Sequence, residues 1–334
     1  MIPLKSMSAR DALATLSMLL VSGFAAGIPA ISIGQNFPSK PIKIIVPYAP
    51  NGLPDVLARV VAQAMSPEIG QQVVIDNKAG ASTIIGAEAA AKSPPDGYTL
   101  FLMDNNSSSI TPAVITKLPY DPVRDFAPIT QGVRGPFFLI VNTSLGVNSL
   151  QEFLTLARKR PGEINYASPG NATVHHITME HLKLLAKLDL VHVPYKGVIQ
   201  VTPGLLANEV SVMFNTLPSV IQHVKAGKLR ILATASAQRT PLMPEVPTLV
   251  ESGFPDLELD TTIGFAAPAG TPRDIVLRLY GAMVKSLRSP EVVSKMHSFG
   301  MEVVATSPEQ FGEQIRVKRA YYAKLVRDIN LKID

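Results

Sequence analysis

The chain has 334 residues, of which 46% are hydrophobic and 17% are charged, with a formal net charge of +5 and no cysteine. These values are typical of a globular protein of about two domains. The lack of cysteine excludes disulfide bonds, thiol nucleophiles, cysteine metal sites and a lipid-modified cysteine anchor. Basic residues are scattered apart from one run of three, Arg158 to Arg160, so the positive charge indicates weak attraction for anions and does not indicate nucleic-acid binding.

The N-terminus has the pattern of a secretory signal peptide. Lys5 and Arg10 precede an apolar run over residues 12–27, which is short for a membrane span. We therefore expect residues 1–33 to be a signal peptide that is cleaved near Ile28-Pro29-Ala30. The alternatives are an uncleaved membrane anchor and a start codon assigned too early.

The first part of the mature chain alternates short β-branched runs with amphipathic segments. This alternation predicts β-α-β units with parallel strands. Pro54 and Asp55 suit the first turn of a helix. The predicted strands are 42–46, 72–76 and 98–103, and the predicted helices are 54–68 and 87–92.

A second series follows a segment with two short apolar runs, 126–129 and 137–141. The predicted strands are 164–167, 190–193, 210–214 and 230–235, and the predicted helices are 150–159, 174–188, 199–206 and 218–226. Residues 263–267 have the pattern of a second crossing, and helices over 274–287, 290–299 and 308–329 are expected to close the chain.

These elements predict an α/β fold with two lobes joined by two hinge crossings. The expected first lobe comprises residues 36–136 together with 260–334, and the expected second lobe comprises residues 137–259. In such a clamshell the loops at the carboxyl ends of the strands meet in a cleft, which is where open α/β sheets bind ligands.

Motifs for catalysis and cofactor binding are absent from the sequence. The chain lacks a Rossmann glycine motif, a P-loop, a Gly-x-Ser-x-Gly nucleophile elbow and a His-Glu-x-x-His helix, and we expect no enzymatic activity, cofactor or metal. His176 and His181 lie on different faces of their helix, and His176 with Glu180 offers only two ligands. A triad of Ser168, His176 and Asp55 can be drawn, but nothing in the sequence fixes its geometry.

Four segments follow predicted strands and lead into helices: residues 48–55, 80–83, 104–108 and 168–173. Each is rich in small or amide side chains, and each can present unpaired backbone N–H groups to a carboxylate at a helix start. The alternative is that their Ser, Thr and Asn residues only cap helices. Asn215 ends another predicted strand and offers both a donor and an acceptor.

Several short motifs occur in a fixed order from residue 37 to the C-terminus. They are Phe37-Pro38-Ser39-Lys40-Pro41-Ile42, Val46-Pro47-Tyr48, Asp76-Asn77-Lys78-Ala79-Gly80, Ser93-Pro94-Pro95-Asp96-Gly97-Tyr98-Thr99-Leu100, Lys117-Leu118-Pro119-Tyr120-Asp121-Pro122, His192-Val193-Pro194-Tyr195-Lys196-Gly197, Met213-Phe214-Asn215-Thr216-Leu217-Pro218-Ser219 and Ala266-Ala267-Pro268-Ala269-Gly270-Thr271-Pro272. As a set they resemble the extracytoplasmic receptors of tripartite tricarboxylate transporters, the Bug-type family.

The resemblance implies a type II periplasmic-binding-protein fold, a periplasmic location and no enzymatic activity. It further implies that a small organic acid binds between the lobes, through loop backbone groups, water and a few side chains, for delivery to membrane transporter subunits. The implied ligand contacts are Tyr48, Asn51, Gly52, Asp55, Ser82, Thr83, Asp104, Asn105 and Asn106 in the first lobe, and Ser168, Asn171, Thr173, His176 and Asn215 in the second.

Four departures from the family pattern bear on the identity of the ligand. Leu53 interrupts the glycine run of the first loop and adds apolar bulk. Ile84 replaces the usual asparagine, and Thr262-Ile263 replaces an aromatic pair. Asn215 replaces the usual aspartate, which removes a negative charge near the ligand.

We therefore interpret the chain as a monomeric receptor that binds a small carboxylate, contacts membrane transporter subunits and does not bind nucleic acid. One alternative is a receptor that passes its signal to a sensor kinase. The other is a hydrolase on the same clamshell, with Ser168 or His176 in catalysis.

Overall fold

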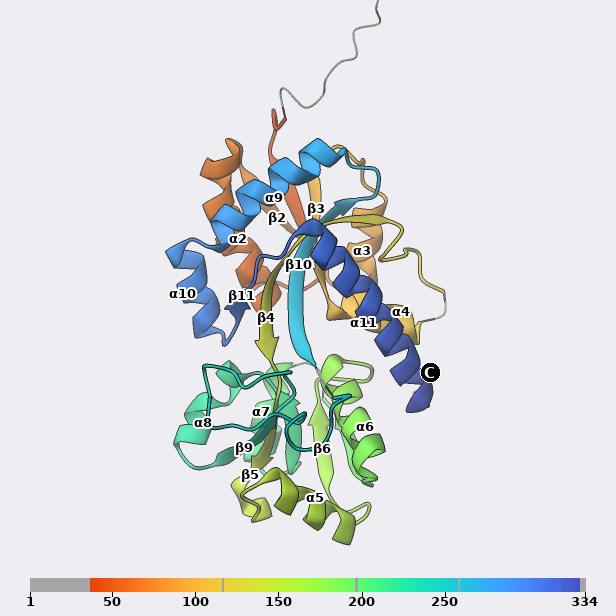
Figure 1. Ribbon diagram of the computed structural model, residues 1–334, viewed down its shortest axis with the longest axis vertical. Helices are drawn as coiled ribbons and strands as arrows, with labels where there is room; N and C mark the ends of the chain where they lie inside the picture. Colours follow the sequence, from red (N-terminus) through yellow and green to blue (C-terminus); the bar gives the residue numbers. More distant parts are fainter. Residues whose placement is uncertain (1–36, 116, 196–197, 258, 331–334) are drawn as a thin grey trace, which may run out of the picture. The chain divides into compact units, whose positions relative to one another are not determined.

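The computed structural model describes residues 37–115, 117–195, 198–257 and 259–330. The predicted signal peptide, Lys196 and Gly197 lie outside the described residues. The described chain forms two mixed β-sheets with helices packed around them (Figure 1). Within this part of the chain, no helix is both long enough and apolar enough to cross a membrane.

The first sheet contains six strands in the order β11-β4-β10-β3-β1-β2. Strand β1 pairs in parallel with β2 and β3, whereas β10 is antiparallel to both β3 and β4. The parallel β-α-β units predicted over the first three strands are therefore confirmed. The strands are β1 (Ile42–Val46), β2 (Val73–Asn77), β3 (Thr99–Asp104), β4 (Phe126–Pro136), β10 (Asp260–Pro268) and β11 (Glu302–Val303).

Helices pack around this first sheet in two groups. They are α2 (Leu53–Ile69), α3 (Ile84–Ala91), α4 (Thr111–Val114), α9 (Arg273–Leu287), α10 (Pro290–Ser298) and α11 (Pro308–Asp328). Helix α2 packs against α9 and α10, whereas α11 packs against β4 and α4. Ile45 and Phe101 belong to the core shared with α3 and α11, so their strand neighbours point to the opposite face.

Local sequence explains where these helices begin and end. Pro54 lies in the first turn of α2, where its missing N–H costs nothing, and Gly70 ends the helix in the left-handed conformation. Ser307 and Gln310 form a capping box at the start of α11.

The second sheet contains five strands in the order β7-β6-β8-β5-β9. Its strands are β5 (Phe138–Asn142), β6 (Asn165–Ser168), β7 (Val191–Pro194), β8 (Val212–Asn215) and β9 (Leu229–Thr234). Its helices are α5 (Leu150–Lys159), α6 (Val174–Ala186), α7 (Val198–Leu206) and α8 (Ile221–Lys225). Strand β6 pairs in parallel with β7 and β8, and β5 is antiparallel to β8 and β9.

Two crossings connect the sheets, as the sequence predicted. At the first, only the buried Phe137 separates β4 from β5. At the second, the chain runs from the end of β9 at Thr234 to the start of β10 at Asp260, where the Ser236 hydroxyl donates to the Asp260 carboxylate. The chain changes sheet between β4 and β5 and again between β9 and β10. The exact boundaries of the two lobes stay a prediction.

Helix α11 contacts the cores of both sheets. Phe311 and Ile315, near its start, pack with residues of the first sheet. Tyr322 and Leu325, near its end, pack with residues of the second sheet. The Tyr321 hydroxyl also lies 3.0 Å from Nδ1 of His181 on α6. The helix therefore forms a third link between the two sheets. This link is made by packed side chains, whereas the two crossings are made by the backbone.

One predicted loop is helical in the structure. Residues 104–108 were expected to form a loop after the third strand, but β3 continues through Asp104 and Asn106–Ile110 form one turn of π-helix, η3, that leads into α4. The wide turn keeps the backbone compact, so that Ser107 and Ser108 are buried instead of exposed.

Replacing Gly264 with alanine tests how closely the crossing strand β10 approaches its neighbours. A Cβ atom there would lie 2.6 Å from the Thr130 carbonyl oxygen and 2.5 Å from the Phe311 ring. That oxygen cannot move without disturbing the β4–β10 pairing, so we expect Gly264→Ala to lower the free energy of unfolding by about 1–3 kcal/mol.

Gly281→Ala is the matched control, because a Cβ atom added at this position on α9 meets no atom within 4 Å. It should raise the free energy of unfolding by about 0.5–1 kcal/mol, since alanine loses less backbone entropy in a helix. Urea denaturation measures the free energy of unfolding of both variants. A change in the same direction for both would contradict the close approach of β10 to Thr130 and Phe311 as the cause.

Candidate functional site

Loops from both sheets line a pocket of about 260 Å³. Most of its lining residues follow the carboxyl ends of strands, which is where the sequence predicted a cleft. They are Pro47, Tyr48, Ala49, Ala79, Gly80, Ser82, Thr83, Asn106 and Thr111 from the first sheet and its helices, and Asn171, Ala172 and Thr173 from the second. We call this pocket the cleft.

The first cleft loop, 47–53, is held from behind by Asp55. The Asp55 side chain is fully buried, and its carboxylate accepts hydrogen bonds from the Asn51 amide at 2.9 Å, Arg59 Nε at 2.9 Å and Asn77 Nδ2 at 2.8 Å. Burial alone would raise the pKa of Asp55, but these hydrogen bonds and the Arg59 charge hold it below its usual value. Asp55 therefore shapes the loop and does not line the cleft.

The second cleft loop contains three consecutive non-glycine residues with positive φ. Ala81, Ser82 and Thr83 have φ values of 45°, 50° and 77°, a conformation that costs energy and is concentrated at functional sites. The Thr83 hydroxyl is buried near the Tyr120 hydroxyl and makes no hydrogen bond of normal geometry with the described residues. Asn51 and Ala172 add two further positive-φ positions, with values of 71° and 54°, so backbone strain is concentrated around the cleft.

Tyr48 and Asn106 place polar side chains in the cleft wall. The Tyr48 hydroxyl donates to the Asp104 carboxylate and accepts from Asn106 Nδ2 at 3.0 Å. Asp104 also accepts from the Ser107 amide at 2.9 Å. Burial raises the pKa of Asp104 although these hydrogen bonds oppose the shift, and burial followed by the Asp104 charge raises the pKa of Tyr48. Asp104 therefore supports Tyr48 from beneath and does not line the cleft.

Asn105 faces away from the cleft. Its side chain is buried and donates to the Asp260 carbonyl oxygen at 2.8 Å, while its own oxygen accepts from the Thr262 amide at 3.1 Å. Asn105 thus ties η3 to the crossing strand β10. The family resemblance implied Asn105 as a ligand contact together with the rest of its loop, of which Asn106 lines the cleft.

The second sheet contributes the loop between β6 and α6. Thr173 caps α6 by accepting from the His176 amide, and its hydroxyl donates to the Gly170 carbonyl oxygen at 2.9 Å. His176 Nδ1 accepts from the Ala172 amide at 3.1 Å. The loop is therefore braced by both the capping residue and the histidine, and its Asn171, Ala172 and Thr173 reach the cleft.

A stack of three rings lies behind this loop. The His192 ring lies 4.8 Å from the Tyr166 ring and 3.9 Å from the His176 ring, and His192 Nε2 lies 2.7 Å from the buried Ser168 hydroxyl. The Ser168–His176 pair of the hydrolase alternative is therefore not formed, because the histidine within hydrogen-bond distance of Ser168 is His192. His192 was not among the predicted site residues, although the parallel register of β6 and β7 places it directly beside Tyr166.

The predicted ligand contacts fall into two groups, those that line the cleft and those that lie outside its lining. Tyr48, Ser82, Thr83, Asn106, Asn171 and Thr173 line the cleft. Asn51, Gly52, Asp55, Asp104, Asn105, Ser168, His176 and Asn215 do not. Asn215 is fully buried at the end of β8, where its oxygen accepts from the Thr216 amide at 2.8 Å. Pro47, Ala49, Ala79, Gly80, Thr111 and Ala172 were not selected, but all except Thr111 adjoin a predicted contact or loop.

The cleft offers hydrogen-bond donors without charged side chains. Its described lining includes no Lys, Arg, His, Asp or Glu, so an anion there would be bound by hydroxyl, amide and backbone N–H groups. Among the described residues, no group of three or more His, Asp or Glu side chains could hold a metal ion. This chemistry fits a carboxylate that is recognised by directed hydrogen bonds.

The chain is similar in sequence to several known proteins. A sequence model described as "Tripartite tricarboxylate transporter family receptor" matches residues 57–331. A protein from the tcbD–tcbE intergenic region of Pseudomonas sp. strain P51 is 35% identical over 296 residues, covering 88% of each chain. Protein BugT of Bordetella pertussis is 32% identical over 309 residues, covering 92% of this chain and 95% of BugT.

Solved structures show the same fold. A structure described as a periplasmic transporter has 37% identity and a TM-score of 0.78, covering 89% of this chain and 100% of its own. An R. palustris protein with adipate has 31% identity and a TM-score of 0.78, covering 89% and 99%. MatC from Rhodopseudomonas palustris with bound malate has 27% identity and a TM-score of 0.75, covering 87% and 100%. The two-lobed periplasmic-binding-protein fold predicted from the sequence is thereby confirmed.

The partly buried His192 predicts a loss of stability in acid. Burial, and then the neighbouring His176, lower the pKa of His192 to about 4. Because the unfolded chain takes up this proton near pH 6.5, the stability that His192 contributes is present above pH 6.5 and is lost as the pH falls toward 4. The maximal slope for one histidine is about 1.4 kcal/mol per pH unit.

We therefore expect His192→Gln to flatten the fall in unfolding free energy between pH 6.5 and pH 4, measured by urea denaturation at several pH values. Glutamine does not titrate and can still bond Ser168. The exposed His297 on α10 provides the control, and His297→Gln should leave the profile unchanged. A wild-type slope in His192→Gln would show that this ring is not held neutral.

Proposed function

The chain belongs to the tripartite tricarboxylate transporter receptor family, as its sequence motifs predicted, and we propose that it is a periplasmic receptor that captures a small carboxylate in the cleft and delivers it to a membrane transporter. Homologues and structural neighbours in this family are substrate-binding receptors and not enzymes.

The observation that carries the ligand class is the chemistry of the cleft lining. The strained loop at 81–83 and Thr173 at the start of α6 both line one pocket, and the partial positive charge of a helix start favours an anion. Thr83 adds a buried hydroxyl without a normal hydrogen bond. Leaving such a group unsatisfied costs about 1–3 kcal/mol, which a ligand oxygen would offset.

The size and composition of the cleft favour a small acid with a short carbon chain. A cavity of about 260 Å³ lies below the usual range for drug-sized ligands. Its apolar lining, Pro47, Ala49, Ala79 and Ala172, suits a few methylene groups. Two structural neighbours were solved with such acids, adipate and malate, which supports the same ligand class here.

Capture by closure follows from the division of the cleft between the two sheets. Each sheet supplies only part of the lining, so each half-site alone would bind weakly. A ligand that contacts both halves stabilises the closed arrangement by its higher affinity for that arrangement. A membrane partner could then distinguish the closed receptor from the open one, which is the basis of delivery. We propose that the receptor acts as a monomer and that residues 1–33 direct its export.

Binding of carboxylates can be tested with adipate and malate as probes. We expect either acid, or another di- or tricarboxylate in the same screen, to raise the thermal unfolding temperature and to give saturable heat in calorimetry. The corresponding neutral diamides control for shape without charge and should not stabilise the protein. Stabilisation by the diamides or by amines, with no response to any acid, would reject the proposed ligand class.

The variant Thr173→Arg tests whether the cleft is the binding site. An arginine at this position would fill the cleft from the second sheet, so carboxylate binding should be lost. The fold should remain, although removal of the helix cap costs about 1 kcal/mol.

Thr173→Ser keeps the cap with a similar hydroxyl and should retain binding within a few-fold. Calorimetry gives the affinities, and circular dichroism checks that both variants are folded. Wild-type affinity in Thr173→Arg would mean that the carboxylate binds elsewhere.

A further inference from the structure

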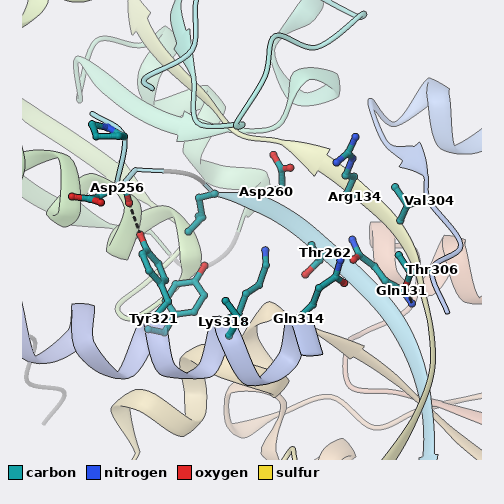
Figure 2. Close-up of a pocket in the computed structure, with 14 residues that line it drawn as sticks. Gln131, Arg134, Asp256, Asp260, Thr262, Val304, Thr306, Gln314, Lys318 and Tyr321 are labelled. Atoms are coloured by element: carbon teal, nitrogen blue, oxygen red, sulfur yellow. Dashed lines mark hydrogen bonds between the residues drawn. The ribbon is translucent and has the colours of Figure 1, made fainter. Parts of the chain in front are cut away.

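A larger pocket lies at the hinge, away from the cleft. It has a volume of about 510 Å³ and is enclosed by strands β4 and β10, the segment that leads into β10, and helix α11 (Figure 2). None of its lining residues lines the cleft. We call it the hinge pocket, and it is bounded by both crossing strands and by the helix that links the two cores.

The hinge pocket contains charged groups of both signs. Figure 2 shows Asp260, Lys318 and Arg134 around the same space, from β10, α11 and β4. The Asp260 carboxylate accepts from the Ser236 hydroxyl, and burial raises its pKa although the Lys318 and Arg134 charges oppose that shift. Arg134 is also paired with Glu302 at 2.8 Å. The site therefore holds a partly buried carboxylate facing an ammonium group.

Two polar atoms in the pocket wall lack hydrogen-bond partners. Gln314 Oε1 and the Tyr322 hydroxyl are buried and have no partner of normal geometry among the described residues, although the Tyr322 hydroxyl lies near the Asn105 side chain. Tyr322 is fully buried. Buried polar groups are nearly always hydrogen-bonded. A polar ligand in the pocket would supply the hydrogen bonds that these two atoms lack.

We propose that the hinge pocket is a second small-molecule site, which takes a zwitterion with an ammonium group and a carboxylate group on a short carbon chain. A simple anion would meet the repulsion of Asp260, and a simple cation would meet that of Lys318. A zwitterion satisfies both, with its ammonium group on Asp260 and the Gln314 oxygen and its carboxylate toward Lys318. Leu259, Val304 and Val317 supply apolar contact for the carbon chain.

The charge pattern can be tested with 6-aminohexanoate and its two singly charged analogues, hexanoate and hexylamine. Calorimetry and saturation-transfer NMR on the full receptor should show saturable binding of the zwitterion, at least tenfold tighter than that of either analogue. No saturable binding of 6-aminohexanoate, or equal binding of an analogue, would overturn the proposal.

The location can be tested with Val317→Trp, which should fill the pocket. Val317 is 57% exposed, so the change adds bulk with little loss of buried contact. Leu277→Trp on α9 is the matched control, because Leu277 is 45% exposed and does not line the hinge pocket. Val317→Trp should weaken 6-aminohexanoate binding at least tenfold and Leu277→Trp should not. Unchanged binding in Val317→Trp would overturn the proposal.

A third variant separates the hinge pocket from the cleft. Thr173→Arg blocks the cleft but leaves the hinge pocket intact, so it should bind 6-aminohexanoate with wild-type affinity. Loss of zwitterion binding in Thr173→Arg would place that ligand in the cleft and reject the second site. This outcome is independent of whether the cleft itself binds carboxylates.

Discussion

The antiparallel pairing of β4 with β10 is the constraint on which the rest of the structure depends. The two strands pair from Asp260 and Pro136 to Pro268 and Phe126, and the chain passes to the second sheet at the Pro136 end of this ladder. Gly264 has no side chain at the point where Thr130 and Phe311 come closest, so α11 can lie against the pair. The same ladder supplies part of the wall of the hinge pocket.

Buried polar groups hold the loops of the cleft in place. Asp55 fixes the Asn51 amide, Asp104 fixes Tyr48, and His176 fixes the Ala172 amide. Each of these supports lies behind the cleft lining and not in it. The positive-φ backbone at Asn51 and Ala172 is therefore maintained by hydrogen bonds that a ligand does not need to make. This arrangement explains how an uncharged lining can be pre-organised for an anion.

Sequence patterns identified the fold more completely than they identified the site. Alternating runs predicted the strands and both crossings, because periodicity reflects which face is buried. They did not reveal that β10 is antiparallel, since direction in a sheet depends on where distant segments meet. Sequence patterns could not show which way each side chain of the site points. Asn105 and Asn106 are neighbours, but Asn106 lines the cleft and Asn105 bonds to β10. His192 was missed because its importance comes from a stack formed across two strands and a helix.

Helix α11 follows every strand of both sheets in the sequence, which affects the order in which the fold can form. The first sheet lacks its crossing strand until β10 has been made, and the core of the second sheet lacks Tyr322, Leu325 and Val326 until the last helix appears. Contacts between residues so far apart in sequence form slowly. Neither sheet therefore has its complete core until helix α11 has been made.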